Sequence, residues 1–428
     1  MNFKMQLNQE EIEILEGKQG ETLQKILKAL VTYGDIFQAE RLVNVTGASH
    51  MAISYDMPAF EGLNDILDEL IKNDIKTKIP FTVNPKPYDF ENVKMTGGQK
   101  GAFKKIYGKQ KFFEEKLLKI GLRDNNSFAC TCYLEQVKNI PAKGSILSWS
   151  GPESVIYANS VLGARTNLNP AIIGLFGAVL GKVPEYGLLT DEGRKAGLNV
   201  VLNTRHLPNV ELLGHAIALK AKGEIPYIQG IDQFLGRRID EPMQDYLKDL
   251  GAVISTSGLG LFHIDHVTPD AVQHGKKLLK ENAEVYIIDD EELSGLQLTY
   301  PMPWKSGKMK PKMAVIGCPH LTVNQVEKWT VLIERALKMH GKVKVAIPTY
   351  LCVDPDVFTR FKANYTMYNK LMDTGVQFSF MCPKMLMSNP KWSNQPVVTN
   401  SNVLRIKSNA RYYDDQELSG VIATGRCK

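Results

Sequence analysis

The spacing of hydrophobic residues predicts helices in the N-terminal third of the chain. In two stretches the apolar residues recur at intervals of three and four positions, which places them on one face of a helix. The first stretch, within "GETLQKILKALVTYGDIF", contains Leu23, Ile26, Leu27, Leu30 and Val31, and the second contains Leu63, Ile66, Leu67, Leu70 and Ile71. We therefore expect two amphipathic helices whose apolar faces join a core.

Loop signals flank the second of these helices. "NVTGASH" precedes it and contains Gly47, and "KTKIPFTVNPKPYDF" follows it as a short strand that runs into the turn Asn84-Pro85. Further along, the lysine-rich pattern of "QKGAFKKIYGKQKFFEEKLLKIG" predicts a solvated helix, and "SFACTCYLEQ" predicts a short extended segment.

The C-terminal third alternates predicted strands and helices. "KMAVIGC" has the pattern of a buried strand, and Thr322 is placed to cap the helix that follows. "KVKVAIPTYLC" is a second strand, "DPDVFTRFKANYTMYNKLMDTG" a second helix that begins near Pro355, and "VQFSFMC" a third strand. This order is typical of a parallel α/β sheet with right-handed crossovers.

Each of these predicted strands ends in a cysteine: Cys318, Cys352 and Cys382. Because ligands bind where the carboxyl ends of parallel strands meet, the three thiols could approach one another. Thiolates favour zinc, copper(I) or iron–sulfur clusters, and structural zinc sites usually contain CxxC pairs, which this chain lacks. Single cysteines from distant segments favour a recessed cluster, although an inert buried thiol remains the alternative for any one of them.

Composition and charge exclude several classes of protein. The chain has 43% hydrophobic and 23% charged residues, which is typical of soluble globular proteins, and its 428 residues suffice for two or three domains. The net charge of +6 comes from scattered basic residues, so we expect no nucleic-acid partner. The N-terminus has no secretory leader and no long apolar run follows, so we expect a cytoplasmic protein with reduced thiols and no membrane partner.

Several motifs resemble the large subunit of the aconitase X family. They are "IGCPHLTVNQVEKW", "CTCYLEQ" against a family pattern of the CTPY type, "YANSVLGARTN", "PEYGLLTDEGRKA" and the opening "EEIEILEGKQGETLQKILKALVTYGDIFQAERLV". The resemblance implies an α/β, multi-domain aconitase-like architecture with parallel βαβ units. Residues 1–428 would form the large-subunit region, with a C-terminal βαβαβ unit over residues 310–385. The family's small swivelling domain is absent here, which implies a separate small subunit and a heterodimer.

The resemblance also implies a cofactor and a site. Members of the family are iron–sulfur hydro-lyases; archaeal ones dehydrate mevalonate 5-phosphate and bacterial ones dehydrate cis-3-hydroxy-L-proline. The implied ligands of the cluster, most simply a 4Fe–4S cluster, are Cys130, Cys318 and Cys382. Cys132 takes the place of the family's proline, and Cys352 is left as a buried thiol. The implied substrate contacts are Gly47, Ala48, Ser49, Asn84 and Pro85.

Three further residues are candidates for chemistry near the cluster. Glu153 and Ser154 could act as acid or base, but these residue types also favour helix N-termini. Arg165 could bind a substrate carboxylate or tie down its own loop. His320, which follows Cys318, could orient the thiolate or cap a helix.

The chain departs from the family pattern at positions that face substrate. Gly151, Pro152 and Glu153 stand where the family usually has Glu-Ser-Ser, Leu168 replaces an arginine, and Val403 replaces a lysine. These changes remove groups suited to holding an anion and moving a proton. The first hypothesis is a dehydratase that removes water from a small 3-hydroxy acid with a cluster iron as Lewis acid. The alternative is an altered or inactive paralogue that acts as a partner subunit, and a zinc hydrolase lacks supporting spacing.

Overall fold

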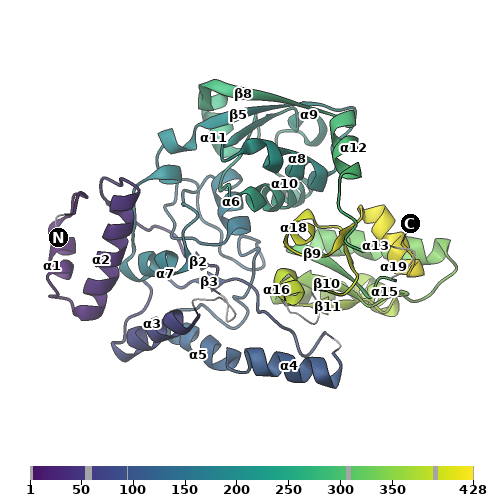
Figure 1. Ribbon diagram of the computed structural model, residues 1–428, viewed down its shortest axis with the longest axis horizontal. Helices are drawn as coiled ribbons and strands as arrows, with labels where there is room; N and C mark the ends of the chain where they lie inside the picture. The colour runs from purple at the N-terminus through teal and green to yellow at the C-terminus, as the bar shows by residue number, and fades with distance from the viewer. Residues whose placement is uncertain (1–2, 54–59, 94, 305–309, 389–393, 428) are drawn as a thin grey trace.

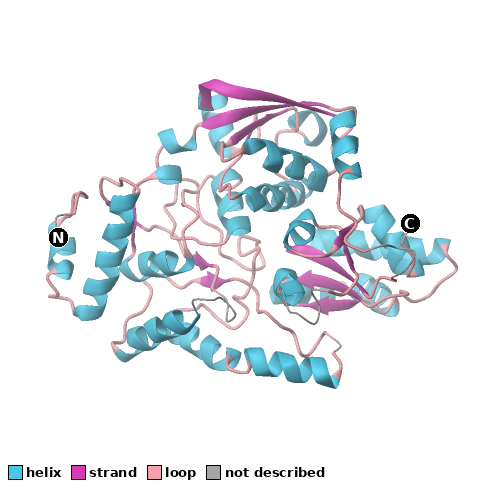
Figure 2. Cartoon of the chain, viewed as in Figure 1, coloured by secondary structure: helices cyan, strands magenta, loops and turns pink. Residues whose placement is uncertain are grey.

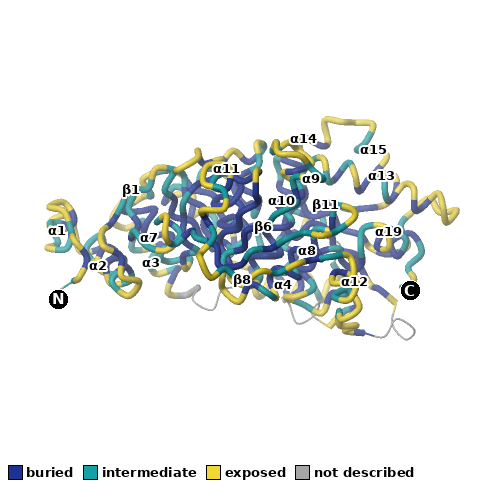
Figure 3. Tube along the Cα trace, turned by 90° about the horizontal axis from the view of Figure 1, so that it is seen from above, coloured by how far each residue is buried: buried dark blue, intermediate teal, exposed yellow. Residues whose placement is uncertain are grey.

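The computed structural model describes residues 3–53, 60–93, 95–304, 310–388 and 394–427. The chain forms three parts around a loop-rich centre (Figures 1 and 2): a mostly helical N-terminal part, a second part built on a parallel sheet, and a C-terminal part built on another. The most buried segments run through the middle of the molecule, and the chain is more exposed towards its ends (Figure 3). None of the described helices is both long and apolar enough to cross a lipid bilayer.

The N-terminal part consists of helices and two small sheets. Its helices are α1 (Gln9–Leu15), α2 (Glu21–Ile36), α3 (Phe60–Lys72), α4 (Gly97–Tyr107), α5 (Gln110–Ile120), α6 (Pro152–Ser160) and α7 (Ala171–Leu180). Strand β1 (Leu42–Asn44) pairs antiparallel with β4 (Lys182–Pro184), and β2 (His50–Met51) pairs parallel with β3 (Thr82–Val83). The predicted apolar faces of α2 and α3 pack in one cluster, which confirms both helices. The predicted strand before Asn84 is β3.

The second part is a four-stranded parallel sheet in the order β7-β6-β5-β8. Its strands are β5 (Ala196–Asn203), β6 (Pro226–Gln229), β7 (His263–Ile264) and β8 (Leu279–Asp289). Its helices are α8 (Val210–Ala221), α9 (Asp232–Leu235), α10 (Glu241–Ile254), α11 (Pro269–His274) and α12 (Asp290–Leu298). Four short 3-10 turns lie at Gly187–Leu189, Glu192–Arg194, Ser255–Ser257 and Gly275–Leu278. Helix α10 packs on α8 and on α6, so the second part is joined to the N-terminal part.

The C-terminal part is a five-stranded parallel sheet in the order β11-β10-β9-β12-β13. Its strands are β9 (Met313–Leu321), β10 (Thr349–Val353), β11 (Gln377–Ser379), β12 (Val397–Thr399) and β13 (Arg411–Tyr412). Its helices are α13 (Val323–Met339), α14 (Pro355–Lys362), α15 (Tyr365–Asp373), α16 (Pro383–Ser388), α18 (Asn402–Lys407) and α19 (Asp415–Thr424). Strand β9 lies at the centre of the sheet and all nine of its residues are buried.

The predicted alternation of strands and helices is therefore present. Thr322 caps α13, because its hydroxyl accepts a hydrogen bond from the backbone N–H of Gln325, whose side chain bonds back to the cap. The predicted second helix is wrong in one respect: it is two helices, α14 and α15. The side chain of Asn364 caps the N-terminus of α15, which favours the start of a new helix at that position.

Two other local predictions were wrong. Residues 127–136 form mostly turns rather than an extended segment, because their amides bond within the segment, as from Leu134 to Thr131; only Phe128 pairs, with Val83. The cysteines also do not all end strands. Cys318 lies inside β9, Cys352 lies inside β10, and Cys382 follows the end of β11.

Candidate functional site

Three cysteines from distant segments come together at one place. The thiol of Cys382 interacts electrostatically with those of Cys130 and Cys318. The backbone N–H of His320, in β9, donates to Sγ of Cys130 (3.4 Å), and the backbone N–H of Cys382 donates to the carbonyl of Lys86 (2.8 Å). Cys318 is buried, whereas Cys130 and Cys382 are partly exposed. The fold therefore gathers the three predicted ligands, with two of them reachable from outside.

The surroundings of these thiols suit a metal cluster. Burial raises the pKa of Cys130, Cys318 and Cys382, so each thiol stays protonated unless a positive centre stabilises its thiolate. Among the described residues no three His, Cys, Asp or Glu side chains converge on a point that could hold a single metal ion. An iron–sulfur cluster does not require such convergence, because its cysteines bind different irons. Three thiols gathered at one place are therefore a donor set of the kind that such a cluster binds.

Two more cysteines lie close to this group. Cys352 is fully buried in β10 and interacts electrostatically with Cys318 and Cys382. Cys132 is also fully buried, near the hydroxyls of Ser154 and Thr82. Burial raises the pKa of both thiols. Cys352 is thus buried as predicted, and Cys132, which takes the place of the family's proline, is buried as well.

A buried hydrogen-bond network centred on His320 joins the three cysteine segments. Nδ1 of His320 bonds to Oδ1 of Asp354 (2.6 Å), and Nε2 donates to the carbonyl of Met381 (3.0 Å), next to Cys382. The hydroxyl of Thr131, next to Cys130, donates to the other carboxylate oxygen of Asp354. His320 thus orients the ligand segments and is not a helix cap. Sequence reasoning missed Asp354, although a carboxylate after a buried strand and before Pro355 was an available signal.

The N-terminus of α6 brings an ion pair to the thiols. The ammonium of Lys384 contacts the carboxylate of Glu153, which is 6% exposed, and Lys384 also interacts with Cys318 and Cys382. Burial raises the pKa of Glu153, but the charge of Lys384 outweighs that effect and the net shift is downward, so the carboxylate is ionised. Sequence reasoning missed Lys384. Its position two residues after a predicted ligand cysteine was the only signal.

Ser154, the neighbour of Glu153, has a different contact. Its hydroxyl donates to the backbone carbonyl of Cys130 (2.7 Å), and its side chain is buried. A hydroxyl committed to a carbonyl is poorly placed to transfer a proton to a substrate. The hydrogen bond from Ser154 therefore holds the Cys130 segment against α6.

The predicted substrate loop is fixed by backbone contacts. Nε1 of Trp149 donates to the carbonyl of Ala48 (2.7 Å), and the carbonyl of Ser49 accepts from the backbone N–H of Thr82 (3.1 Å). A Cβ on Gly47 would lie 2.6 Å from the end of the Leu147 side chain, so a larger residue there would require that side chain to move. The loop is thus held between the segment that leads into α6 and strand β3.

The predicted turn Asn84-Pro85 lies between this loop and the thiols. Oδ1 of Asn84 bonds to Nε2 of His50 (3.1 Å), and a Cβ on Gly151 would lie 3.5 Å from the same Oδ1. Pro85 is buried, and the next residue, Lys86, accepts the amide of Cys382. The fold therefore places the loop 47–49, the turn and the start of α6 beside the cysteines.

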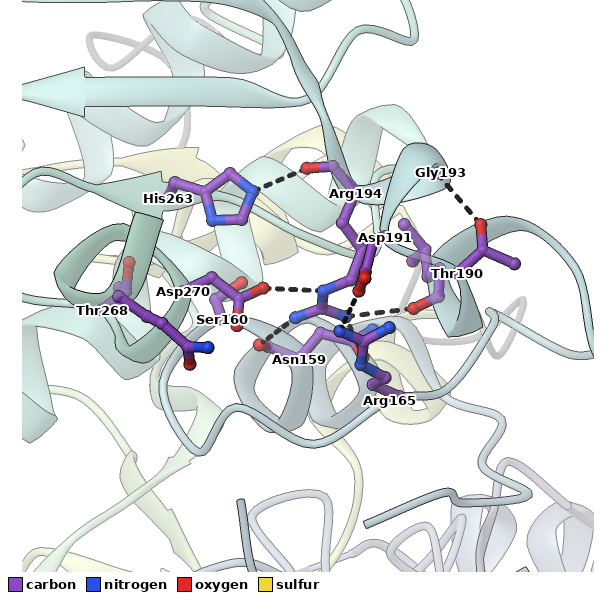
Figure 4. Close-up of polar contacts among 12 residues, drawn as sticks. Asn159, Ser160, Arg165, Thr190, Asp191, Gly193, Arg194, His263, Thr268 and Asp270 are labelled. Carbon is purple, nitrogen blue, oxygen red and sulfur yellow. Dashed lines mark hydrogen bonds and ion pairs between the residues drawn. The ribbon is translucent and has the colours of Figure 1, made fainter. Parts of the chain in front are cut away.

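Arg165 lies in another group of contacts (Figure 4). Its guanidinium donates to the carbonyl of Leu189 (2.8 Å) and to Oδ1 of Asp191 (2.5 Å). Nearby, the buried Arg194 donates to Asp270 (2.7 Å) and to the carbonyl of Asn159 (3.0 Å). Among the described residues, no side-chain hydrogen bond or ion pair joins Arg165 to the thiols or to the substrate loop. The contacts it does make tie loops together around Arg194.

The departures from the family pattern leave apolar groups in the structure. Val403 is 2% exposed and packs in the same cluster as Cys318 and Cys352. Leu168 is partly buried against the central cluster. Neither position offers a charge to an anionic substrate.

A separate cavity of about 250 Å³ borders Cys318 at the contact between the second and C-terminal parts. Glu211, at the start of α8, and Asp249, on α10, line it together with Lys328. Burial, with Asp249 nearby, raises the pKa of Glu211 well above its ordinary value. The carboxyl of Glu211 accepts the backbone N–H of Asn402, in α18, so it also links the two parts.

Comparisons with known proteins agree with this arrangement. Residues 4–192 match the family model described as aconitase X first domain, and residues 198–297 match the model described as aconitase X second domain. The chain is 30% identical to the phosphomevalonate dehydratase large subunit of Methanothermobacter thermautotrophicus over 76% of each chain. It is 24% identical to the cis-3-hydroxy-L-proline dehydratase of Hypocrea jecorina over 81% of this chain and 56% of that protein.

A solved structure shares the fold. The crystal structure of Thermococcus kodakaraensis aconitase X in its holo-form superposes with a TM-score of 0.79 at 24% identity. The match covers 98% of this chain and all of that chain. The predicted fold class, a mixed α/β architecture with parallel sheets, is confirmed.

Proposed function

The chain belongs to the aconitase X family and is a hydro-lyase, and we propose that it removes water from a small 3-hydroxy acid with an iron–sulfur cluster as cofactor. The single observation that carries the proposal is the convergence of Cys130, Cys318 and Cys382 beside the ion pair of Glu153 and Lys384. The three thiolates would hold the cluster, most simply of the 4Fe–4S type. When bound, such a cluster supplies a Lewis acid that polarises the departing hydroxyl.

In this proposal Glu153 is the base that takes the proton from the carbon next to the substrate carboxylate. Its carboxylate is ionised and buried beside the thiols, and Lys384 fixes its orientation. Ser154 holds the Cys130 segment in place. The hydrogen bonds of His320 and Asp354 fix the three ligand segments relative to one another. The base and the ligands are therefore positioned by one continuous set of contacts.

The substrate would bind on the loop Gly47, Ala48 and Ser49 and on the turn Asn84-Pro85. These segments lie between α6 and the cysteines, and their backbones are held by Trp149 and Thr82. Relatives are named for phosphomevalonate and for cis-3-hydroxy-L-proline, and we propose a substrate of the same 3-hydroxy acid class. Arg165 would act indirectly, through the loops that it ties together.

We also propose that the active enzyme has two subunits. The relative named above for phosphomevalonate is called a large subunit, which implies a small partner. That partner would be the swivelling domain of the family in a separate chain, so residues 1–428, with their C-terminal unit at 310–385, would supply the cluster and part of the site. We place the complex in the cytoplasm, where its cysteines stay reduced.

A second candidate function rests on the replaced residues. Gly151 and Pro152 stand before Glu153 at the start of α6, and Val403 is buried and apolar. These changes favour a paralogue that keeps the fold and the partner but no longer turns over substrate.

One experiment separates the two candidates. The chain would be purified without oxygen together with its small subunit, reconstituted with iron and sulfide, and supplied with mevalonate 5-phosphate, cis-3-hydroxy-L-proline and other 3-hydroxy acids. Formation of the alkene product, and its loss in Glu153→Gln, supports the dehydratase. A complex that binds iron and its partner yet converts none of these acids supports the paralogue. A protein that takes up no iron overturns the cofactor assignment.

A further inference from the structure

His50 is a fully buried histidine next to the predicted substrate loop, and it has no role in the steps described above. Nδ1 of its ring lies 2.9 Å from Oγ1 of Thr82, and Nε2 lies 3.1 Å from Oδ1 of Asn84. The ring thus bridges β3 and the turn that follows it. Both of its nitrogens are engaged, so the direction of these two hydrogen bonds decides what Asn84 can offer to a ligand.

The direction follows from the amide oxygen of Asn84. Oδ1 can only accept, so Nε2 of His50, 3.1 Å away, donates to it and carries the ring proton of a neutral imidazole. Nδ1 is then the acceptor and receives the hydroxyl hydrogen of Thr82. Oγ1 of Thr82 in turn accepts from Nδ2 of Asn139 (2.8 Å), which also donates to the carbonyl of Ser49 (3.2 Å). The thiol of Cys132 lies near the same hydroxyl as a weaker partner.

The ring is neutral in this environment. Burial lowers the pKa of His50 to about 4, so near pH 7 the imidazole carries one proton and one tautomer is selected. Because Oδ1 of Asn84 faces His50, Nδ2 of Asn84 faces away from it, and no acceptor for Nδ2 is recorded among the described residues. Asn84 is half-buried, and next to it Gly151 carries no side chain. The amide N–H groups are therefore available to a ligand.

We propose that His50 is a positioning residue that holds Asn84 as a hydrogen-bond donor, so that Asn84 recognises an acceptor oxygen of the substrate, such as a carboxylate oxygen. The inference rests on the proposed function, because it takes Asn84 as a substrate contact. It adds the polarity of that contact: Asn84 donates and does not accept. Four hydrogen bonds link Ser49 to Asn84 through Asn139, Thr82 and His50, and they begin and end in the two segments assigned to substrate binding.

Kinetics of the two-subunit complex test the proposal, with cis-3-hydroxy-L-proline and mevalonate 5-phosphate as probes. In His50→Leu the amide of Asn84 is free to rotate, and we expect KM to rise by about tenfold with a smaller change in kcat, as for the loss of one hydrogen bond. In His50→Gln the side-chain N–H₂ can replace Nε2–H, and KM should stay within about threefold of the wild type. Unfolding temperatures of both variants show whether either has simply lost its fold.

Thr82→Val provides a second variant that leaves His50 and Asn84 in place. It removes a hydroxyl that bonds to both His50 and Asn139, and we expect KM to rise with a modest fall of the unfolding midpoint. A KM in both His50→Leu and Thr82→Val equal to that of the wild type would overturn the proposal.

A readout independent of turnover separates this inference from the proposed function. In the protein labelled with nitrogen isotope in histidine, the His50 signal, identified by its loss in His50→Gln, should show a protonated Nε2 and an unprotonated Nδ1 at pH 7. A proton on Nδ1 contradicts the proposal even in an active enzyme. A complex that dehydrates neither probe overturns the proposed function, whereas the tautomer still decides the polarity of Asn84.

Discussion

At the scale of single residues, the site combines thiols whose charge depends on a metal centre with an ion pair that is charged without one. Burial raises the pKa of the three predicted ligand thiols, whereas the pKa of Glu153 is shifted downward by Lys384 despite burial. The same low-dielectric environment therefore keeps the cysteines neutral and the carboxylate ionised. The difference in charge between Glu153 and the thiols therefore depends on the neighbouring ammonium of Lys384.

The ligand assignment predicts which cysteines control iron content. Replacing Cys130, Cys318 or Cys382 by serine should abolish most of the iron and the visible absorption of the reconstituted protein, because each thiolate would bind one iron. Cys352→Ala is the matched control, since it removes a buried thiol that borders the same group. Iron analysis of anaerobically purified variants checks this. Loss of iron in Cys352→Ala with retention in Cys382→Ser would reverse the assignment.

The role of Glu153 predicts a kinetic change. Glu153→Gln keeps a hydrogen-bond acceptor for Lys384 but cannot take a proton, and we expect kcat to fall by about 100-fold or more while iron content is unchanged. Glu115→Gln, at an exposed position of α5, is the control and should be neutral. The measurement is the rate of alkene formation by the reconstituted complex, and a Glu153→Gln enzyme with normal kcat would exclude this base.

At the scale of elements, strand β9 contains the ligand Cys318 and packs closely against β10 at the preceding residue, Gly317. Gly317 has φ of +104°, and a Cβ there would lie 2.4 Å from the carbonyl oxygen of Cys352. The pairing of β9 with β10 shifts register at this point, between Leu351 and Val353. On β9 the irregularity covers residues 317–320 and so includes Cys318, and the path of the backbone here sets where that ligand points.

This geometry predicts a large cost for one added methyl group. Gly317→Ala should lower the free energy of unfolding by about 2–4 kcal/mol, because it combines an unfavourable φ with a backbone clash. Gly295→Ala, in the exposed part of α12 where nothing lies within 4 Å of the new Cβ, should be neutral or slightly stabilising. Urea unfolding followed by circular dichroism measures both. Equal stability of the two variants would show that β9 can relax.

At the scale of the whole molecule, the site lies where the N-terminal and C-terminal parts meet. The N-terminal part supplies Cys130 and α6, and the C-terminal part supplies Cys318 and Cys382. The second part reaches the C-terminal part through Glu211, whose buried carboxyl accepts the amide of Asn402. A change at the contact between Glu211 and Asn402 is therefore expected to alter the stability of the whole chain.

The contact of Glu211 predicts a pH-dependent stability. Its raised pKa means that the folded state holds a proton that the unfolded state releases above about pH 4.3, so this group destabilises the fold increasingly as pH rises above that value. Glu211→Gln removes the penalty and keeps an acceptor for Asn402. We expect its melting temperature to exceed that of the wild type at pH 8 and the difference to shrink towards pH 4.5. Glu115→Gln serves as the control, and a variant less stable than the wild type at pH 8 would contradict the sign.

Local sequence predicted the elements better than it predicted the site. The helices α2, α3 and α13 have apolar faces that repeat with the helical period, and β9, β10 and β11 of the C-terminal sheet lie in short apolar runs, so these elements were visible without partners. Strands β12 and β13 were not predicted. The turns around Cys130 were not, because that segment is apolar yet bonds within itself. Lys384 and Asp354 had no local pattern to distinguish them from other charged residues.

The sequence by itself determined the alternation of strands and helices, the capping by Thr322 and, through the motifs, the family. Each of these depends on residues close together in the chain, where spacing alone fixes the side-chain direction. Only the tertiary structure decided that His320 joins the three cysteine segments, that Lys384 keeps Glu153 charged and that His50 bonds to Thr82 and Asn84. These are interactions across 32 to 231 positions of sequence, and hydrogen-bond direction and burial arise only when such distant groups meet.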